Sequence, residues 1–123
     1  MIQREPTIDE LVNAYNRGDA RAFANLFTEN APVYEHPNRL TQRGREELFG
    51  YYQQVFSQYP ANRTEVLHRI IVGNRVIDHE RVSRGDGEGN VFDVVTIYQI
   101  RNGLIERLDF VRDNRHVAQV AKT

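Results

Sequence analysis

The stretch that decides the fold is Val66–Arg112, which reads VLHRIIVGNRVIDHERVSRGDGEGNVFDVVTIYQIRNGLIERLDFVR. Branched and aromatic residues fill it in four runs, and turn-forming residues separate the runs. Asn102-Gly103 is the dipeptide preferred in a type I′ hairpin turn, and Gly73-Asn74 suits a type II′ turn because its glycine comes first. The glycine-rich segment Gly85–Asn90 indicates a longer connection. Four consecutive antiparallel strands are therefore predicted, at Val66–Val72, Arg75–Arg84, Val91–Arg101 and Leu104–Arg112.

The first half of the chain supplies three helices that can cover such a sheet. Thr7 and Glu10 form a capping box before a run of apolar residues at helical spacing, which Gly18 ends. Asp19 then caps a second, shorter helix. The third and longest helix is predicted at Gly44–Tyr59, where apolar side chains recur at Leu48, Tyr51, Tyr52, Val55, Phe56 and Tyr59.

Two short segments lie between the second and third helices. Pro32–Pro37 is predicted to be extended, because a proline keeps the residue before it out of the helical region. Alternation then places Tyr34 and His36 on one side of this segment and Glu35 on the other. Arg39–Arg43 is polar and is predicted to be a loop.

Together these elements predict a single α+β domain over residues 1–123, in which a curved antiparallel sheet packs over three N-terminal helices. A hydrophobic fraction of 40% and a charged fraction of 27% are ordinary for a globular protein of this length, which can bury one sizeable core. The tail at residues 114–123 is predicted to be weakly helical at most.

Charge and composition exclude several classes of function. Lys and Arg number 16 against 17 Asp and Glu, so the net charge of −1 provides no basic surface for nucleic acid or an anionic membrane. The absence of cysteine excludes a disulfide scaffold, a thiolate nucleophile and a cysteine-ligated metal. No apolar run approaches membrane-spanning length, and the N-terminus lacks the apolar core of a signal peptide, so a cytoplasmic protein is expected.

The first hairpin turn also predicts which side chains share a face of the sheet. It places Arg69 opposite Asp78 and Leu67 opposite Glu80. If the face that carries Asp78 and Glu80 lines a pocket, burial raises the pKa of at least one of them, which is the usual route to a catalytic acid or base. A plain ion pair between Asp78 and Arg69 is the alternative. Alternation sends His79 to the opposite face, so no metal site is expected at these three residues.

The second hairpin turn places Thr96 opposite Asp109, which is a further carboxylate candidate with a solvated aspartate as the alternative. Both faces of the predicted sheet carry apolar residues. An exposed apolar sheet of this extent usually marks an association surface, so a homodimer through the outer face is predicted. Because a β-bulge in either long strand exchanges the faces beyond it, these assignments depend on regular pairing.

Five short motifs are distributed along the chain: Asn16-Arg17-Gly18-Asp19, Leu26-Phe27, Tyr34-Glu35-His36-Pro37, Gly44-Arg45-Glu46-Glu47 and Arg101-Asn102-Gly103-Leu104-Ile105. In this order and spacing they resemble the SnoaL-like and ketosteroid-isomerase-like branch of the nuclear transport factor 2-like superfamily. The resemblance covers nearly the whole chain. It implies a cone-shaped sheet wrapped over helices, a deep apolar pocket inside the cone and, frequently, homodimers.

The resemblance also implies what chemistry to expect. Ketosteroid isomerases carry an aspartate base at the position of His36, and the tyrosine and protonated aspartate of their oxyanion hole correspond to Leu11 and Thr96. Only a supporting tyrosine is retained, as Tyr52. Steroid isomerisation by that mechanism is therefore not expected. SnoaL-like cyclases and limonene epoxide hydrolases, with acidic residues on the closing strand or its neighbours, favour Asp109.

We expect a small cofactor-independent enzyme that acts on a largely apolar small organic molecule by general acid–base chemistry, as an isomerase, a polyketide cyclase or an epoxide hydrolase. His36 is predicted to point into the pocket as base or acid. A histidine merely hydrogen-bonded at a strand end is the alternative. The catalytic carboxylate partner is predicted to be Asp78 or Asp109, with Glu80 as a third candidate. Substrate binding is predicted for Tyr34, Tyr52, Glu80, Thr96 and Tyr98.

Two other functions remain open for the same fold. One is a non-catalytic module that binds a small ligand in the pocket. The other is a dimeric scaffold whose outer sheet face is the functional part. A pocket in which His36 and a carboxylate converge favours the enzyme, a pocket lined only by apolar groups favours the binding module, and a filled interior favours the scaffold.

Overall fold

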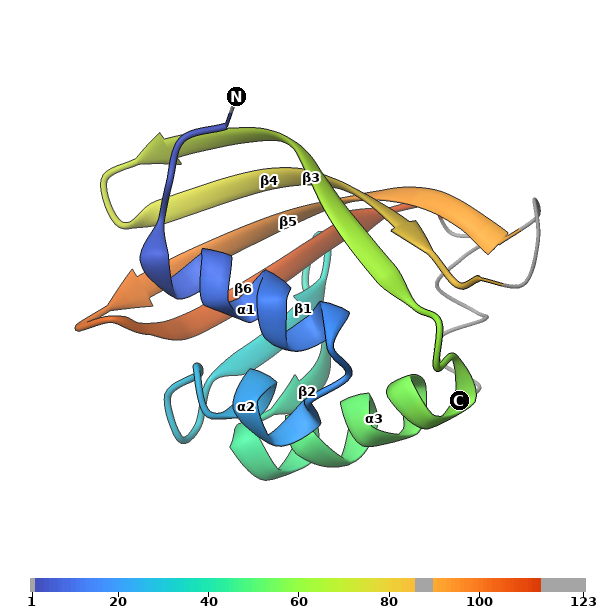
Figure 1. Cartoon of the computed structure of the whole chain (residues 1–123). Helices are drawn as coiled ribbons and strands as arrows, with labels where there is room; N and C mark the ends of the chain where they lie inside the picture. Colours follow the sequence, from blue (N-terminus) through green and yellow to red (C-terminus); the bar gives the residue numbers. More distant parts are fainter. Residues whose placement is uncertain (1, 86–89, 114–123) are drawn as a thin grey trace.

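Within the described residues, 2–85 and 90–113, six strands pair into one curved sheet and three helices lie on its concave side (Figure 1). This arrangement, taken from a computed structural model, confirms the predicted α+β architecture. The strand order is β2-β1-β6-β5-β4-β3, and every neighbouring pair is antiparallel except β1 with β6. The elements are α1 (Pro6–Asn16), α2 (Ala20–Ala24), β1 (Pro32–Glu35), β2 (Arg39–Arg43), α3 (Arg45–Gln58), β3 (Arg63–Val72), β4 (Arg75–Ser83), β5 (Val91–Arg101) and β6 (Leu104–Arg112).

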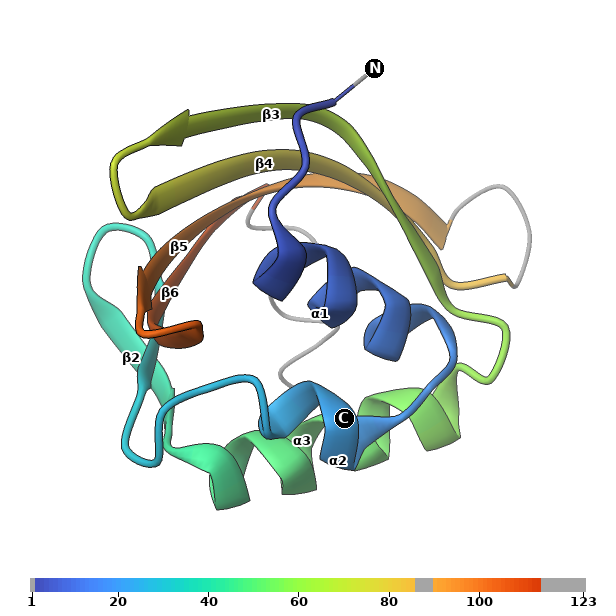
Figure 2. The same ribbon diagram turned by 60° about the vertical axis from the view of Figure 1, so that its left-hand side comes forward.

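The hydrophobic core lies between the helices and the concave face of the sheet. The sheet bends around α1, while α2 and α3 close the space on the other side of that helix (Figure 2). Burying an apolar side chain of ordinary size stabilises a fold by roughly 1.5–3 kcal/mol. The largest fully buried apolar side chains come from both layers: Ile8, Phe27, Val33, Leu48, Val55, Val76, Ile105 and Leu108.

The four predicted strands and their hairpin turns are confirmed. At the β5–β6 turn Asn102 has a φ of 53° and Gly103 a φ of 79°, the two positive values that a type I′ turn requires. Gly73 has a φ of 58° at the β3–β4 turn. β3 begins at Arg63, earlier than predicted, and β4 ends at Ser83. The predicted tail and most of the glycine-rich connection lie outside the described residues.

The predicted second and third helices are confirmed. Asp19 caps α2 by accepting a hydrogen bond from the Ala22 backbone N–H, at 3.0 Å. α3 lies between its caps Gly44 and Tyr59. Gly44 has a φ of 90°, and a Cβ there would lie 2.7 Å from the Glu29 carbonyl oxygen, so only glycine fits. None of the helices in the described part of the chain is both long and apolar enough to cross a membrane.

The first helix begins earlier than its predicted capping box. Glu5 is the N-cap, and its carboxylate accepts hydrogen bonds from the backbone N–H groups of Thr7 and Ile8, at 2.8 and 3.2 Å. Pro6 occupies the first helical position, where a missing N–H leaves no donor unsatisfied. The Thr7 hydroxyl instead donates to the Gly103 carbonyl, at 3.0 Å, and so attaches α1 to the β5–β6 turn.

The prediction of a loop at Arg39–Arg43 is wrong, because this segment is the edge strand β2. It pairs antiparallel with β1, and Thr41 Oγ1 donates a hydrogen bond of 3.1 Å to the Val33 carbonyl. The strand carries a single apolar side chain, Leu40, so the alternation typical of a half-buried strand is absent from its sequence. An edge strand with polar side chains does not depend on that alternation.

Pairing between β3 and β4 is irregular at one point. The register shifts at Leu67, so that Val66, and not Leu67, lies opposite Glu80. The predicted pairing of Leu67 with Glu80 is therefore wrong, whereas Arg69 lies opposite Asp78 as predicted. An extra residue in one strand increases its local bend and twist. β3 accordingly curves strongly along its length (Figure 1).

A second irregularity lies between β5 and β6, close to their turn. Thr96 lies opposite Phe110, and the prediction that it lies opposite Asp109 is wrong. Tyr98 lies opposite Leu108. Because side chains alternate along a strand, Leu108 and Phe110 face the helices and Asp109 faces away from them. The predicted face of β6 is therefore reversed beyond this point.

A buried ion-pair network joins α1 to the sheet. Arg69 on β3 holds the Asp78 carboxylate on β4 with two hydrogen bonds, at 2.7 Å from Nε and 2.9 Å from Nη2, and both side chains are fully buried. Its Nη1 donates to Asp9 of α1 at 2.7 Å and to the Gln3 carbonyl at 3.0 Å. One guanidinium thus links two strands, a helix and the N-terminal segment. The structure shows the ion pair that the sequence offered as the alternative role for Asp78.

Replacing Arg69 by methionine should destabilise the fold strongly. Methionine fills similar space, but it leaves the Asp78 carboxylate buried beside no cation, and removing one partner of a buried ion pair costs about 3–5 kcal/mol. Urea denaturation should show that Arg69→Met lowers the free energy of unfolding by this amount. The control is Arg75→Met, at an exposed position of the same hairpin, which should change the free energy of unfolding by less than about 0.5 kcal/mol. Equal, small losses in the two variants would contradict the role assigned to Arg69.

The convex face of the sheet carries both apolar and charged side chains. Ile70 and Val72 at the end of β3 are 58% and 64% exposed. On the neighbouring strands, Arg81 and Asp93 form an exposed ion pair, with 2.9 Å between Nε and Oδ1, and His79 also contacts Asp93. This face therefore offers apolar contacts only over part of its area.

The homodimer predicted through this face stays a prediction. Burial of Ile70 and Val72 against a second copy would remove exposed apolar surface from water. Light scattering at micromolar protein should then give the mass of a dimer, and not the 14.3 kDa of one chain. Ile70→Asp should return the monomer mass, because a charge in a closed apolar contact is costly. A monomer mass for the unaltered chain would rule the dimer out.

Candidate functional site

A cavity of about 340 Å³ lies between the concave face of the sheet and helices α1 and α3. Small-molecule sites in proteins occupy roughly 300–1,000 Å³ and are mostly apolar with a few polar groups. The cavity has such a volume, and its wall combines apolar side chains with polar and charged ones. Its apolar wall includes Leu11, Val55, Phe92, Val94, Leu108 and Phe110.

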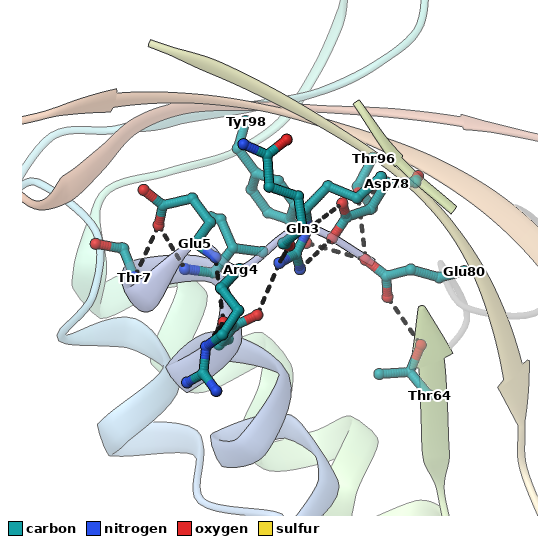
Figure 3. A network of polar contacts seen from close by, with 12 residues as sticks. Gln3, Arg4, Glu5, Thr7, Thr64, Asp78, Glu80, Thr96 and Tyr98 are labelled. Carbon is teal, nitrogen blue, oxygen red and sulfur yellow. Dashed lines mark hydrogen bonds and ion pairs between the residues drawn. The ribbon is translucent and has the colours of Figure 1, made fainter. Parts of the chain in front are cut away.

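Glu80 on β4 is the central polar group of the cavity wall. Its carboxylate accepts three hydrogen bonds, from Thr64 Oγ1 at 2.8 Å, Thr96 Oγ1 at 3.0 Å and the Tyr98 hydroxyl at 3.2 Å (Figure 3). The donors come from β3 and β5, the strands on either side of β4. Glu80 is only 6% exposed. A carboxylate has about four acceptor positions, so one position remains for a molecule in the cavity.

Burial raises the pKa of Glu80 above its ordinary value of 4.5. The charge of neighbouring Asp78 acts in the same direction, while the hydrogen bonds from Thr64, Thr96 and Tyr98 act to lower the pKa. Burial outweighs the hydrogen bonds because no cation faces the carboxylate closely enough to pair with it among the described residues. A carboxyl group with a raised pKa is suited to accept and donate protons near neutral pH.

Two buried tyrosines lie in the same part of the wall. Tyr52 from α3 and Tyr98 from β5 are 7% and 3% exposed, and burial raises both pKa values well above 10. Both phenols therefore remain protonated donors at neutral pH. Tyr98 donates to Glu80. Within the described residues the Tyr52 hydroxyl makes no hydrogen bond, so it is free to donate to a molecule in the cavity.

Charged side chains occupy a further part of the wall. Glu35 at the end of β1 forms an ion pair with Arg112 at the end of β6, with 3.1 Å between Oε1 and Nη2. Burial raises the pKa of Glu35, although Arg112 acts to lower it. Arg84, which follows β4, lines the cavity as well and is 6% exposed. No three metal-binding side chains come together in residues 2–85 and 90–113.

The SnoaL-like domain family model matches residues 8–108 of this chain, from the first turn of α1 into β6, and this span holds most of the residues that line the cavity. The chain belongs to the SnoaL-like domain family. This membership confirms the superfamily that the sequence motifs indicated. No curated protein matches the sequence significantly.

Solved structures share the fold of this SnoaL-like domain. An uncharacterized cystatin fold protein from Novosphingobium aromaticivorans has a TM-score of 0.79 at 27% identity, covering 87% of this chain and 96% of that one. A candidate polyketide cyclase from Sinorhizobium meliloti has a TM-score of 0.74 at 19% identity, covering 87% and 94%. A hypothetical protein with a ketosteroid isomerase-like fold from Catenulispora acidiphila, in complex with trimethylamine, has a TM-score of 0.79 at 14% identity, covering 97% and 95%. Structural similarity at these identities shows the fold only, so the function must be argued from the residues of the site.

The SnoaL-like fold brings four of the predicted site residues together. Glu80, Thr96, Tyr98 and Tyr52 all line the cavity. Asp78, predicted to be catalytic, lies on the same face of β4, but both of its carboxylate oxygens are bound by Arg69 and it does not line the cavity. The four grouped residues are therefore the predicted site residues that line the cavity, and their roles stay predictions.

The other three predicted residues lie elsewhere. His36 follows β1, is exposed and does not line the cavity, so the prediction that it points into the pocket is wrong. Tyr34 packs its ring against the Arg107 guanidinium, 4.2 Å from the ring centroid, and Arg107 pairs with Asp109 at 2.9 Å. The predicted alternation along β1 holds, but the side that faces the cavity is that of Glu35.

Sequence reasoning missed several polar residues of the wall, among them Thr64, Glu35, Arg84 and Arg112. Thr64 lies in the part of β3 before its predicted start, and Glu35 was placed on the side away from the candidate histidine. Arg84 and Arg112 stand at strand ends, where charged residues are usually solvated. Alternation along β6 places Arg112 on the same cavity-facing side as Phe110. This side can be assigned only when the register shift between β5 and β6 is known.

The stability of Glu80→Gln relative to the unaltered chain should increase with pH. The pKa of Glu80 is higher in the folded chain than in the unfolded chain, so folding becomes less favourable as the pH rises from 4.5 through the folded pKa. Glutamine does not titrate and lacks this loss. Urea denaturation between about pH 4 and about pH 8 should show the difference in unfolding free energy, variant minus unaltered chain, rising and then levelling off. A difference that is constant with pH would contradict a raised pKa.

Proposed function

We propose that this SnoaL-like domain is an enzyme that moves a proton to or from a small, largely apolar molecule, with Glu80 as the general acid–base group. The observation that carries the proposal is a buried carboxyl in the cavity wall, held by three hydroxyl donors and paired with no cation in the described residues. A fixed position and a raised pKa are the two properties that acid–base catalysis requires of such a group.

The chemistry that fits this site is removal of a proton from a carbon next to a carbonyl group. The ionised Glu80 carboxylate takes the proton, and the electron pair of the broken C–H bond moves to the carbonyl oxygen, which becomes an enolate. Tyr52, a neutral donor at the cavity wall, stabilises that oxygen by a hydrogen bond. Return of the proton to a different carbon completes an isomerisation. Attack of the enolate carbon on a second carbonyl forms the new C–C bond and turns that carbonyl oxygen into an alkoxide, which takes the proton back from Glu80 and so completes a cyclisation.

The proposal moves the acid–base role from His36 to Glu80. His36 is exposed outside the cavity, while Glu80, predicted to bind substrate and named as a third candidate for the catalytic carboxylate, is the carboxyl that a bound molecule would meet. Of the three predicted reaction classes, isomerisation and cyclisation use Glu80 as a base. Epoxide opening would use its protonated form to donate to the epoxide oxygen. The name of the Sinorhizobium meliloti relative, a candidate polyketide cyclase, agrees with the cyclisation class.

Exchange of carbon-bound protons in D₂O tests the proposal without knowledge of the natural substrate. The probe is 2-tetralone, and ¹H NMR follows the loss of its α-proton signals. The unaltered chain should accelerate exchange above the buffer rate. Glu80→Gln should reduce the acceleration by about a hundredfold or more, because it removes the acid–base group while keeping the shape of the side chain.

Two further variants define the result. Glu65→Gln changes an exposed glutamate on β3 and should leave the exchange rate as it is. His36→Ala should also leave it as it is, and a loss of exchange in that variant would return the acid–base role to the histidine. If the unaltered chain exchanges protons only at the buffer rate, but native mass spectrometry finds a retained small molecule, the non-catalytic binding module becomes the better account.

A further inference from the structure

Arg84 is a buried cation with no carboxylate partner among the described residues. It is 6% exposed, and its guanidinium contacts are with neutral groups. Nη1 donates to Asn62 Oδ1 at 3.2 Å and lies 3.4 Å from the Tyr15 hydroxyl. The rings of Tyr59 and Phe92 flank it, with centroids 4.8 and 5.1 Å away. Arginine does not lose its proton in proteins, and a buried charge is costly unless it is paired.

Two other arginines with buried side chains do have carboxylate partners. Arg69 is held by Asp78, and Arg112 pairs with Glu35. The pairing of Arg112 is incomplete, because its Nε is buried and has no hydrogen-bond partner in the described part of the chain. Both Arg84 and Arg112 line the cavity. Two guanidinium groups with unused capacity for an anion thus border the same space.

The positive charges of these two arginines reach the same part of the cavity. Burial raises the pKa of Tyr51 on α3 to about 12, and both Arg112 and Arg84 act to lower it. Tyr51 itself lines the cavity. Both guanidinium groups therefore lie close enough to one point of the wall for their charges to act there together.

The wall, as far as the described residues form it, is positive, although the chain carries a net charge of −1. Among these residues the ionisable side chains, tyrosines aside, are three arginines and two glutamates: Arg39, Arg84, Arg112, Glu35 and Glu80. The arginines outnumber the glutamates even when both glutamates are ionised, and the excess grows when one of them is protonated. A concave site of one sign with low-dielectric walls concentrates ligands of the opposite charge.

We propose that the cavity binds a small amphipathic carboxylate, an apolar body with one carboxylate group, and that Arg84 holds that group. The planar guanidinium offers two parallel N–H donors to a carboxylate, and Arg112 adds a second positive charge to the same wall. The apolar body lies against the apolar wall. This inference rests on the proposed function, since it names the substrate class for the same cavity.

The placement of Arg84 along β4 agrees with a molecule bound at two points. Residues 80, 82 and 84 alternate onto one face, and Glu80, Val82 and Arg84 all line the cavity. Four residues of strand separate the α-carbons of Glu80 and Arg84 by roughly 13 Å. A carboxylate held at Arg84 therefore leaves the remainder of the molecule to extend toward the acid–base group.

The test compares 4-phenylbutanoate with its amide, 4-phenylbutanamide, which match in shape and differ in charge. Titration calorimetry on the full chain should give a Kd about ten- to a hundredfold lower for the carboxylate, as charged hydrogen bonds predict. Arg84→Met should remove that difference. Arg81→Met is the matched control, because it makes the same substitution on the outer face of the same strand and should keep the difference.

A second measurement needs no variant and so does not depend on the folding of Arg84→Met. In ¹⁵N NMR spectra of the unaltered chain, the Arg84 Nε–H signal should shift on addition of 4-phenylbutanoate and stay in place with the amide. Equal Kd values for acid and amide, binding of neither, or a difference that survives in Arg84→Met would each overturn the proposal.

Asp86 and Glu88 follow Arg84 in the sequence and lie outside the described residues, so the test includes the double variant Asp86→Asn, Glu88→Gln. An unchanged Kd for 4-phenylbutanoate in that variant supports the proposal. A Kd that falls about tenfold or more would show that one of these acids neutralises Arg84, and the proposal would fail.

Glu80→Gln separates this inference from the proposed function. If the variant keeps the preference for the carboxylate while the unaltered chain exchanges no α-protons, the enzyme proposal fails and the carboxylate site stands. If α-proton exchange depends on Glu80 but acid and amide bind equally, the enzyme proposal stands and the carboxylate site fails. The two experiments thus have separate readouts on the same cavity.

Discussion

The pairing of β5 with β6 decides which side chains reach the cavity. Alternation along a strand is strict, so a shift of one residue exchanges its whole set of side chains between the two faces. The observed register turns three side chains of β6 toward the helices: Leu108, Phe110 and Arg112. It leaves Asp109 on the outer face, where it forms an ion pair with Arg107. The same kind of irregularity in β3 accompanies the bend of the sheet. Irregular pairing therefore produces both the hollow and its lining.

Two carboxylates on one face of β4 have different surroundings, and this difference separates their roles. Asp78 is fully buried and receives two hydrogen bonds from a guanidinium, so its charge is neutralised within the protein. Glu80 is almost as buried, but its donors are neutral hydroxyl groups, and burial dominates its pKa. The first carboxylate holds the layers together. The second is left to interact with what enters the cavity.

Much of the fold could be predicted from the sequence because its signals are local. Asn102-Gly103 and Gly73-Asn74 mark the two tight hairpins, and the apolar stripe of Gly44–Tyr59 marks the long helix. The edge strand at Arg39–Arg43 could not be found in this way, because all of its side chains except Leu40 are polar and no apolar alternation marks it. Only its pairing with β1 shows it to be a strand. The spacing of apolar residues therefore predicts a helix or strand only where one face of that element is buried, because burial is what makes apolar residues recur at regular intervals.

The site could be predicted only in part, because it depends on pairing between segments far apart in the chain. Glu80 and Thr96 were found as polar residues among apolar neighbours on strands with a clear period. Asp109 was placed wrongly, because no local feature of β6 marks the extra residue. Arg84 and Arg112 were missed since a charged residue at a strand end looks solvated until the neighbouring elements are in place.

The hydroxyl groups around Glu80 have a consequence for the dynamics of the site. A hydroxyl hydrogen rotates about its C–O bond, so Thr64, Thr96 and Tyr98 can each change from donor to acceptor while their oxygens stay in place. A proton that arrives on the carboxyl can be accommodated by one such rotation. The heavy atoms of the network need no rearrangement between the two charge states, and the reorganisation energy of a proton transfer is correspondingly small.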